Sequence, residues 1–294
     1  MKTSRQNSKL KRRSAFTLIE IMVASVIMVV MVGLVIQITS EVLKVWNRSS
    51  GKLSANAEAR IALDFLTQDL ETAVFRDNQM QWLRSENDTV TGPAGETTAT
   101  VALRLFSPAL DRDQSLAGDI CAIAYSLDYK NVVDPSDTDD RSFVLYRLLV
   151  QPPTTFDNLM GADNQEELPN KNSNDWGSAS FLGDNGANYL VSNVVEFEVE
   201  FHVVDDGNPN TDTLVTGDTI FGGTDATVGA GALNAAEEFF QKPLSYALIK
   251  LTIISDEGMD LVRNLDKIAL SLNDVLVEHG EVFTRRVNFL ARPL

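Results

Sequence analysis

The chain has 294 residues, of which 44% are hydrophobic and 22% are charged. These proportions are typical of a folded protein and exclude a collagen-like or wholly disordered chain. With 41 acidic against 25 basic residues, the formal net charge is −16, which argues against a general nucleic-acid-binding protein. One cysteine and two histidines exclude an internal disulfide framework and a cysteine-based zinc site, and offer few ways to build an acid–base active site.

The charge is distributed unevenly along the chain. Residues 1–15 contain six basic and no acidic residues, so the remainder carries 19 basic against 41 acidic residues. A basic segment ahead of an apolar run and an acidic body is typical of a protein whose N-terminus stays in the cytoplasm while its body crosses the membrane. We therefore expect residues 1–15 to be a basic leader peptide and the body to be periplasmic.

An apolar run over residues 16–38 follows the leader. Of these 23 residues, 18 are apolar, and at about 1.5 Å per residue a helix of this length reaches about 35 Å, enough to cross a bilayer. The run is longer than the apolar core of a cleaved secretory signal, and no A-x-A-like site follows it. The sequence therefore predicts a transmembrane helix over residues 16–38.

Glu20 is the one charged residue in this run. A carboxylate inside a membrane helix costs roughly 2.5–3.5 kcal/mol on insertion scales, so a plain anchor has no reason to keep it. Two explanations are open: Glu20 lies close enough to the cytoplasmic interface to be hydrated, or it meets a positive charge when subunits associate. Cleavage between Ala15 and Phe16 would supply such a charge, because the new α-ammonium would lie four residues before Glu20.

Residues 12–20, Arg-Arg-Ser-Ala-Phe-Thr-Leu-Ile-Glu, resemble the processing site of type IV prepilins and type II secretion pseudopilins, G/A-F-T-L-[IV]-E ahead of an apolar helix. The resemblance implies that a membrane-embedded prepilin peptidase cleaves after Ala15 and methylates the new amine of Phe16. It also implies that Glu20, with Thr17 beside it in the motif, serves assembly by pairing with the N-terminus of a neighbouring subunit. Most members have glycine at the position of Ala15.

Helical periodicity continues from the apolar run to about residue 76. Apolar residues recur at spacings near three to four and seven, which is the pattern of one stripe along an amphipathic helix. We expect residues 39–76 to continue the membrane helix and to pack on a globular domain, with a potential kink at residues 49–51. The stripe comprises Val42, Trp46, Leu53, Ala57, Ile61, Phe65, Leu66, Leu70 and Val74.

After about residue 77 the pattern changes to strands, which gives an α+β fold: a long N-terminal helix packed on an antiparallel β-sheet domain with long loops. The clearest strand is 195–203, where valine and phenylalanine alternate with glutamate and His202. Further strands are expected near 101–105 and at 120–127, 143–150, 246–254 and 282–290, with a helix over 261–277. Residues 87–98, 152–185 and 205–231 are expected to be surface loops within the periplasmic domain, residues 77–294.

Two acidic loop segments are candidates for calcium. Asp206, Asn208, Asn210 and Asp212 place oxygen atoms at alternate positions, but proline at the fourth position and Gly217 at the twelfth do not support an EF-hand. A second cluster holds four aspartates between residues 134 and 140. A solvated loop is the preferred interpretation of both, with calcium as the alternative, and we expect no other cofactor.

The remaining chemically distinctive residues have structural interpretations. His202 and His279 lack a nearby nucleophile in the sequence, so we expect a surface histidine and a helix-terminal histidine. Cys121 lies in an apolar strand and is predicted to be a buried small hydrophobe. For Arg285 and Arg286 two interpretations are open: they pair with carboxylates within a sheet, or they are an ordinary pair of strand charges.

The size of the chain, its many strands and its segment 283–289 resemble the J-type minor pseudopilins and the W-type minor pilins. The resemblance implies a minor or tip-proximal structural subunit of a pilus or secretion pseudopilus, without enzymatic activity. Its partners would be prepilin peptidase, other pilin or pseudopilin subunits, an inner-membrane assembly platform and membrane lipid, with no nucleic acid. Two alternatives stay open: a minor pilin that binds a target through its long loops, and a membrane-tethered periplasmic enzyme.

Overall fold

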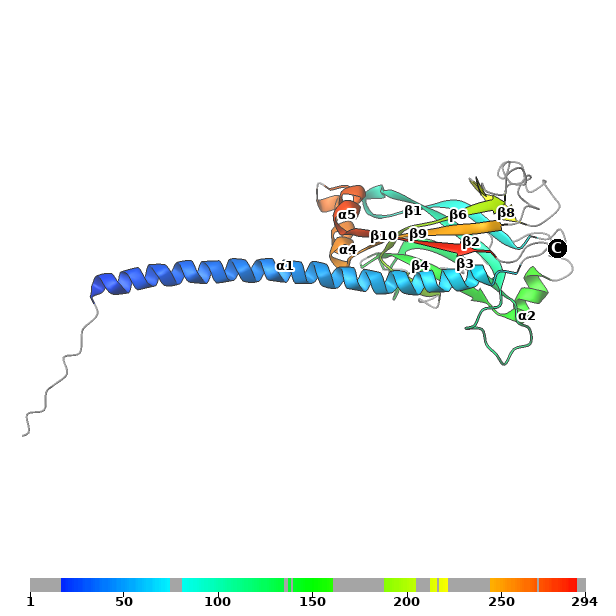
Figure 1. Cartoon of the computed structure of the whole chain (residues 1–294), viewed down its shortest axis with the longest axis horizontal. Coiled ribbons are helices and arrows are strands. Elements are labelled where there is room, and N and C mark those ends of the chain that lie inside the picture. Colours follow the sequence, from blue (N-terminus) through cyan, green and yellow to red (C-terminus); the bar gives the residue numbers. More distant parts are fainter. Residues whose placement is uncertain are drawn as a thin grey trace, which may run out of the picture. The chain divides into compact units, whose positions relative to one another are not determined.

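The computed structural model describes residues 17–74, 81–134, 137–138, 140–160, 188–204, 212–215, 217–221, 244–268 and 270–289. The chain divides into two compact units, Met1–Ser49 and Ser50–Leu294. Helix α1, Leu18–Glu71, contributes residues to both units and continues as helix through residues 49–51. The expected α+β fold is confirmed: a long N-terminal helix is followed by a large, mostly antiparallel sheet (Figure 1).

Ten strands of the second unit form one sheet within the described residues. Along the main path the order is β10-β9-β6-β2-β3-β4-β5, while β1 pairs with β2 and β8, and β7 pairs with β6. The strands are β1 Leu83–Thr91, β2 Thr97–Ser107, β3 Cys121–Lys130, β4 Ser142–Val150, β5 Tyr189–Ser192, β6 Val194–Val204, β7 Asp212–Val215, β8 Thr219–Phe221, β9 Leu244–Ile254 and β10 Gly280–Asn288.

One pairing in this sheet is parallel. Strands β2 and β6 run in the same direction and share a single paired position, Thr100 opposite Phe197, whereas every other described strand pair is antiparallel. Parallel partners need a long connection, and here β3, β4 and β5 intervene along the chain. The sheet therefore consists of two antiparallel halves that meet at one narrow seam.

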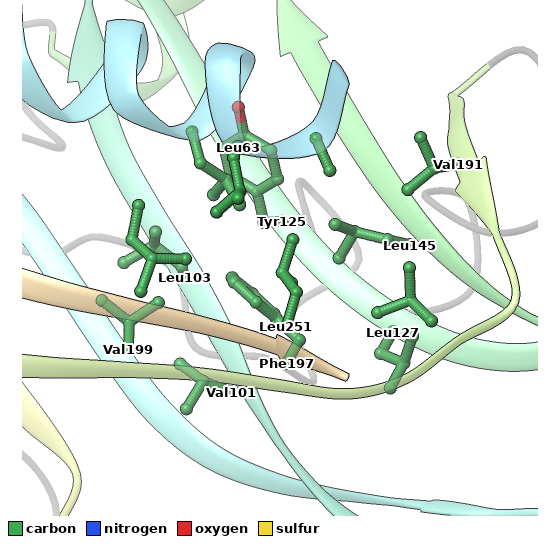
Figure 2. Packing of buried hydrophobic residues seen from close by; sticks show 14 of the residues in the cluster. Leu63, Val101, Leu103, Tyr125, Leu127, Leu145, Val191, Phe197, Val199 and Leu251 are labelled. Carbon is green, nitrogen blue, oxygen red and sulfur yellow. The ribbon is translucent and has the colours of Figure 1, made fainter. Parts of the chain in front are cut away.

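The part of α1 in the second unit packs on the inner face of this sheet. Its buried apolar side chains are Ala55, Ala59, Ala62, Leu63, Leu66 and Leu70. Figure 2 shows Tyr125 reaching up to α1 beside Leu63, with Leu103, Phe197 and Leu251 beneath them. Three of these six residues are alanines, so they contribute less buried apolar surface than the leucines do.

The predicted apolar stripe is wrong in the first turns of this helical segment. Leu53 is 73% exposed, Ile61 is 48% exposed, and Ala57 is also exposed. The alanine positions fit the closely packed side of the helix, where the larger Leu53 and Ile61 would need more space. Leu66 and Leu70 belong to the predicted stripe and are fully buried.

Several strand predictions are confirmed. In β6 the five apolar residues at alternate positions from 195 to 203 are buried, while Glu196, Glu198, Glu200 and His202 lie on the opposite face and are partly or fully exposed. Strands β2, β3, β4, β9 and β10 also overlap the segments that apolar patterning predicted. The alternation of apolar and polar residues predicted β6 correctly because one face of the strand contacts the core and the other faces solvent.

The prediction of a loop over residues 87–98 is wrong. Strand β1 runs to Thr91, a short 3-10 turn η1 covers Pro93–Gly95, and β2 begins at Thr97. The polar sequence of β1 is tolerated because buried Glu86 accepts hydrogen bonds from Arg84 at 3.1 Å and from Arg104 of β2 at 3.2 Å. Charged side chains that satisfy one another across two strands carry no apolar alternation, so the pattern missed this hairpin.

The predicted helix over 261–277 is two short helices, α4 Asp256–Arg263 and α5 Leu272–His279, with the 3-10 turn η3 Leu265–Lys267 between them. Each helix has its own N-cap: Ser255 accepts from Gly258 N, and Ser271 forms a capping box with Asp274. Figure 1 places both helices together at one end of the sheet domain. The helical spacing of apolar residues continues across the turn, because the turn also buries Leu265. This continuity explains why the sequence pattern predicted a single helix.

The other two predicted loops contain regular structure. Residues 152–185 begin with α2 Pro152–Thr154 and the π-helix η2 Thr155–Leu159, and residues 205–231 include β7 and β8. The loop prediction is wrong for these parts. Residues 161–185, 205–211, 216 and 222–231 of these stretches lie outside the described residues.

Candidate functional site

The N-terminus of α1 brings together two of the predicted site residues, Thr17 and Glu20. The backbone N–H and the hydroxyl of Thr17 donate to Oε2 of Glu20 at 2.9 and 3.0 Å, and the backbone N–H of Glu20 donates to the Thr17 hydroxyl at 3.3 Å. This reciprocal arrangement is a capping box, which satisfies backbone donors that the first helical turn leaves free. Ala15 and Phe16, the predicted cleavage and methylation positions, lie outside the described residues.

The helix that follows exposes an almost wholly apolar surface. The large apolar side chains of residues 18–38 are 48–75% exposed, and an 18-residue window of α1 reaches a mean hydropathy of 2.8. The hydroxyls of Ser25 and Thr39 donate to backbone carbonyls one turn earlier, at 2.8 Å each, so these polar atoms have partners within the helix. Such a surface is stable in lipid or against other apolar helices.

A shallow apolar depression lies directly beside the capped end of α1. It is lined by Ile19, Met22, Val23, Val26 and Ile27. The apolar side chains that line it can contact lipid chains or a second apolar helix. Glu20 therefore places one carboxylate at the border of a surface that otherwise offers only van der Waals contacts.

Within the second unit, a buried ionic network joins α1 to the sheet. Arg147 on β4 donates from Nε to Asp69 at 2.8 Å and from Nη2 to Asp69 at 3.1 Å, and it also contacts Asp111 at 2.7 Å. The hydroxyl of Tyr125 donates to the same Asp69 carboxylate. Burial and the Asp69 charge raise the pKa of Tyr125 well above its ordinary value.

The sequence patterns did not predict this buried network. Asp69 is not among the residues of the predicted apolar stripe, yet it is fully buried. Burial lowers the pKa of Arg147, but the hydrogen bonds that Arg147 donates to Asp69 and Asp111, together with the negative charge of Asp69, more than offset this and raise the pKa overall. The available signal was the position of Asp69, which lies three residues after Leu66 and next to Leu70 on the buried face.

The calcium candidates are only partly described. Asp206, Asn208 and Asn210 lie outside the described residues, and the Asp212 carboxylate accepts a hydrogen bond from the Ser245 hydroxyl at 3.0 Å. In the acidic segment 131–140, Asn131 donates to Asp137 at 3.4 Å. Across the part of the chain that the structure describes, no three His, Cys, Asp or Glu side chains are arranged to hold a metal ion.

The other distinctive residues take structural positions. Cys121 is fully buried in β3, as predicted, and burial raises the pKa of its thiol. His279 ends α5 as expected, whereas His202 stacks on Tyr246 with ring centres 4.1 Å apart. Arg285 pairs with Asp64 of α1 at 2.6 Å, so its carboxylate partner comes from the helix and the prediction of a partner in the sheet is wrong.

A family model for the prokaryotic N-terminal methylation motif matches residues 10–36 of this chain. The match covers the end of the basic leader, the expected cleavage position, the Thr17–Glu20 cap and most of the apolar run. It supports a type IV pilin-like chain and points to a structural protein that is processed by prepilin peptidase and assembles with other such subunits. Comparison with curated proteins and with solved structures found no match.

Proposed function

We propose that this chain is a minor or tip-proximal structural subunit of a type IV pilus or a type II secretion pseudopilus. The observation that carries the proposal is the coincidence of the methylation motif at residues 10–36 with a capped, apolar, exposed helix that holds one carboxylate near its start. In this proposal residues 16–38 anchor the chain in the inner membrane, and residues 77–294 lie in the periplasm. The apolar helix then becomes the contact surface within a filament.

In this proposal the Glu20 carboxylate has different partners before and after assembly. In the membrane, Glu20 accepts two hydrogen bonds from its own Thr17, which lowers the cost of holding a carboxylate in an apolar phase. Cleavage after Ala15 creates an α-ammonium on Phe16, next to Thr17. The Glu20 carboxylate of one subunit then attracts the ammonium of a neighbour, and this pair fixes the register between helices that otherwise slide on apolar surfaces.

The first experiment is the mass of the N-terminal peptide from membrane-extracted protein. We expect a peptide that begins at Phe16 and carries one additional methyl group. An intact leader, in a host that contains the peptidase, would contradict processing and leave a tethered periplasmic domain. Replacing Ala15 with leucine is expected to leave the precursor uncleaved, because the peptidase accepts a small residue there, while Ser14→Ala serves as the matched control.

A second experiment separates assembly from insertion. Glu20→Ala is expected to be inserted and cleaved normally but to be absent from sheared filaments, since the charge that sets register is missing. Glu41→Ala is the matched control, because Glu41 is an exposed glutamate on the same helix beyond the apolar run. Incorporation of Glu20→Ala at the control level would refute the assembly role of Glu20 while leaving the processing result untouched.

A further inference from the structure

Strand β10 forms one edge of the sheet. All nine of its residues pair with β9, from Gly280 opposite Ile254 to Asn288 opposite Tyr246, without a register shift. It stands at the end of the strand order, and no other described strand pairs with it. One edge of a nine-residue strand therefore presents backbone groups that no described strand satisfies.

The direction of these backbone groups follows from two hydrogen bonds that flank the strand. Ser255 N donates to His279 O at 3.2 Å, and Phe289 N donates to Ser245 O at 3.1 Å. Because the N–H and C=O of a residue point to the same side of a strand and alternate along it, the odd-numbered residues between 279 and 289 face β9. The backbone groups of Val282, Thr284, Arg286 and Asn288 therefore point to the free edge.

A polar groove adjoins this edge. It has a volume of about 380 Å³ and lies between the last turns of α1 and β10, with Thr67, Gln68 and Glu71 on the helix side and Arg285 and Arg286 on the strand side. Arg285 is held by Asp64 at 2.6 Å and by the Thr67 hydroxyl at 3.3 Å. The helix thus supplies a fixed wall of hydrogen-bonding side chains beside the free edge.

Arg286 gives this edge a charge preference. Its guanidinium carbon lies 3.7 Å from the centre of the Tyr246 ring, and its Nε donates to Asn288 at 3.0 Å. Tyr246 stacks in turn on His202, so the guanidinium is held in place. Among the described residues no carboxylate forms an ion pair with Arg286, which leaves an oriented cation on an exposed side chain.

We propose that the free edge of β10 binds an extended segment of another protein by strand addition, with an acidic side chain of that segment opposite Arg286. Long edge strands are normally protected by proline, bulges, shortness or charged side chains, and β10 has none of the first three. It does carry charged side chains, and the charge of Arg286 is the one that would favour an acidic segment. The net negative charge of the chain does not prevent an acidic partner, because charges beyond about 8 Å are largely screened at physiological ionic strength. The proposal does not depend on filament assembly.

The test uses the full chain in detergent micelles and two fluorescent peptides of alternating threonine and valine, about nine residues long. One peptide carries two glutamates on one face and the other carries two lysines at the same positions. Thr284→Pro removes one outward N–H without removing a bond to β9, and an edge strand tolerates proline there. Thr284→Ala is the matched control because it keeps the N–H.

We expect the acidic peptide to bind more tightly than the basic one, and Thr284→Pro to weaken it by about tenfold or more while Thr284→Ala changes it by less than about threefold. Arg286→Glu should reverse the preference between the two peptides. Binding should also slow amide hydrogen exchange at Val282, Thr284, Arg286 and Asn288 in the unmodified chain, a readout that holds even if the proline variant fails to fold.

Three results would overturn the proposal. The first is equal binding of the acidic peptide by Thr284→Pro and Thr284→Ala, with both variants folded. The second is no binding of either peptide at about 1 mM, which corresponds to a free energy weaker than about −4 kcal/mol. The third is a peptide-free dimer that Thr284→Pro dissociates, because the occupant of the edge would then be a second copy of this chain.

Discussion

Replacing Asp69 with alanine removes the carboxylate on which the buried network of α1, β3 and β4 depends. The side chain of Asp69 is 1% exposed and that of Arg147 is 6% exposed, so the variant leaves a guanidinium in the protein interior. The Arg147 guanidinium makes four hydrogen bonds to carboxylates. The two to Asp69, at 2.8 and 3.1 Å, are lost in the variant, while the two to Asp111, at 2.7 and 3.2 Å, remain. The hydroxyl of Tyr125 also loses its acceptor.

Removing one partner of a buried ion pair typically costs about 3–5 kcal/mol, because the other charge is left uncompensated. Asp111 is 46% exposed, so it compensates Arg147 from a solvated position and keeps the loss toward the lower end of this range. For a folded unit of this size, a loss of about 3 kcal/mol lowers Tm by roughly 6–12 °C. Asp111→Ala, which leaves the buried pair intact, is expected to cost about 1 kcal/mol or less.

The assay is thermal unfolding of the full chain in detergent, followed by near-UV circular dichroism, which reports packing around Tyr125 and its neighbours. A triple variant, Asp69→Leu with Arg147→Met and Tyr125→Phe, removes every polar member of the buried set and should recover most of the lost stability. If Asp69→Ala and Asp111→Ala lower Tm equally, the assignment of Asp69 as the dominant partner is refuted. If the triple variant is as unstable as Asp69→Ala, the loss comes from packing and the electrostatic argument fails.

Two further predictions concern other contacts of the second unit. Burial raises the pKa of Glu58, and the charge of Asp256 adds to this, although the Ser192 hydroxyl donates to Glu58 at 3.2 Å. The ionised side chain therefore destabilises the folded state above its raised pKa. Glu58→Gln should increase Tm by about 1–2 °C at pH 7, and this gain should vanish as the pH falls through that pKa. A gain in Tm that grows on acidification would contradict this prediction. Ser271→Ala removes the capping box of α5 and is expected to cost about 1 kcal/mol in a urea titration, whereas Asn273→Ala, an exposed change in the same helix, should leave the midpoint almost unchanged.

Much of the fold could be predicted because strong local patterns coincide with burial. The alternation in β6 and the apolar runs of β3, β4 and β9 indicated strands, since one face of each meets the core. The apolar run indicated the N-terminal helix through its length and composition, although its side chains are exposed in the structure. At the candidate site, Glu20 and Thr17 were identified from the motif, and the structure adds that they cap the same turn.

The missed features depend on partners that are distant along the chain. Burial of Asp69 is stabilised by its ion pair with Arg147, which lies 78 residues away in the sequence. A local sequence pattern does not predict such a pair. The polar strand β1 is accommodated in the same way, through Arg104 on its neighbour. The break between α4 and α5 was visible locally in the caps at Ser255 and Ser271, but apolar spacing was given more weight than the serines.

The narrow seam between β2 and β6 affects how the domain bears mechanical load. Helix α1 is tied to one half of the sheet by Asp64 and Arg285 of β10, which are 56% and 41% exposed, and to the other half by Asp69 and Arg147 of β4, which are almost fully buried. Screened surface pairs yield before buried ones. A pull on α1 would therefore detach the β10 half first, while the β4 half stays attached to the helix and retains the load.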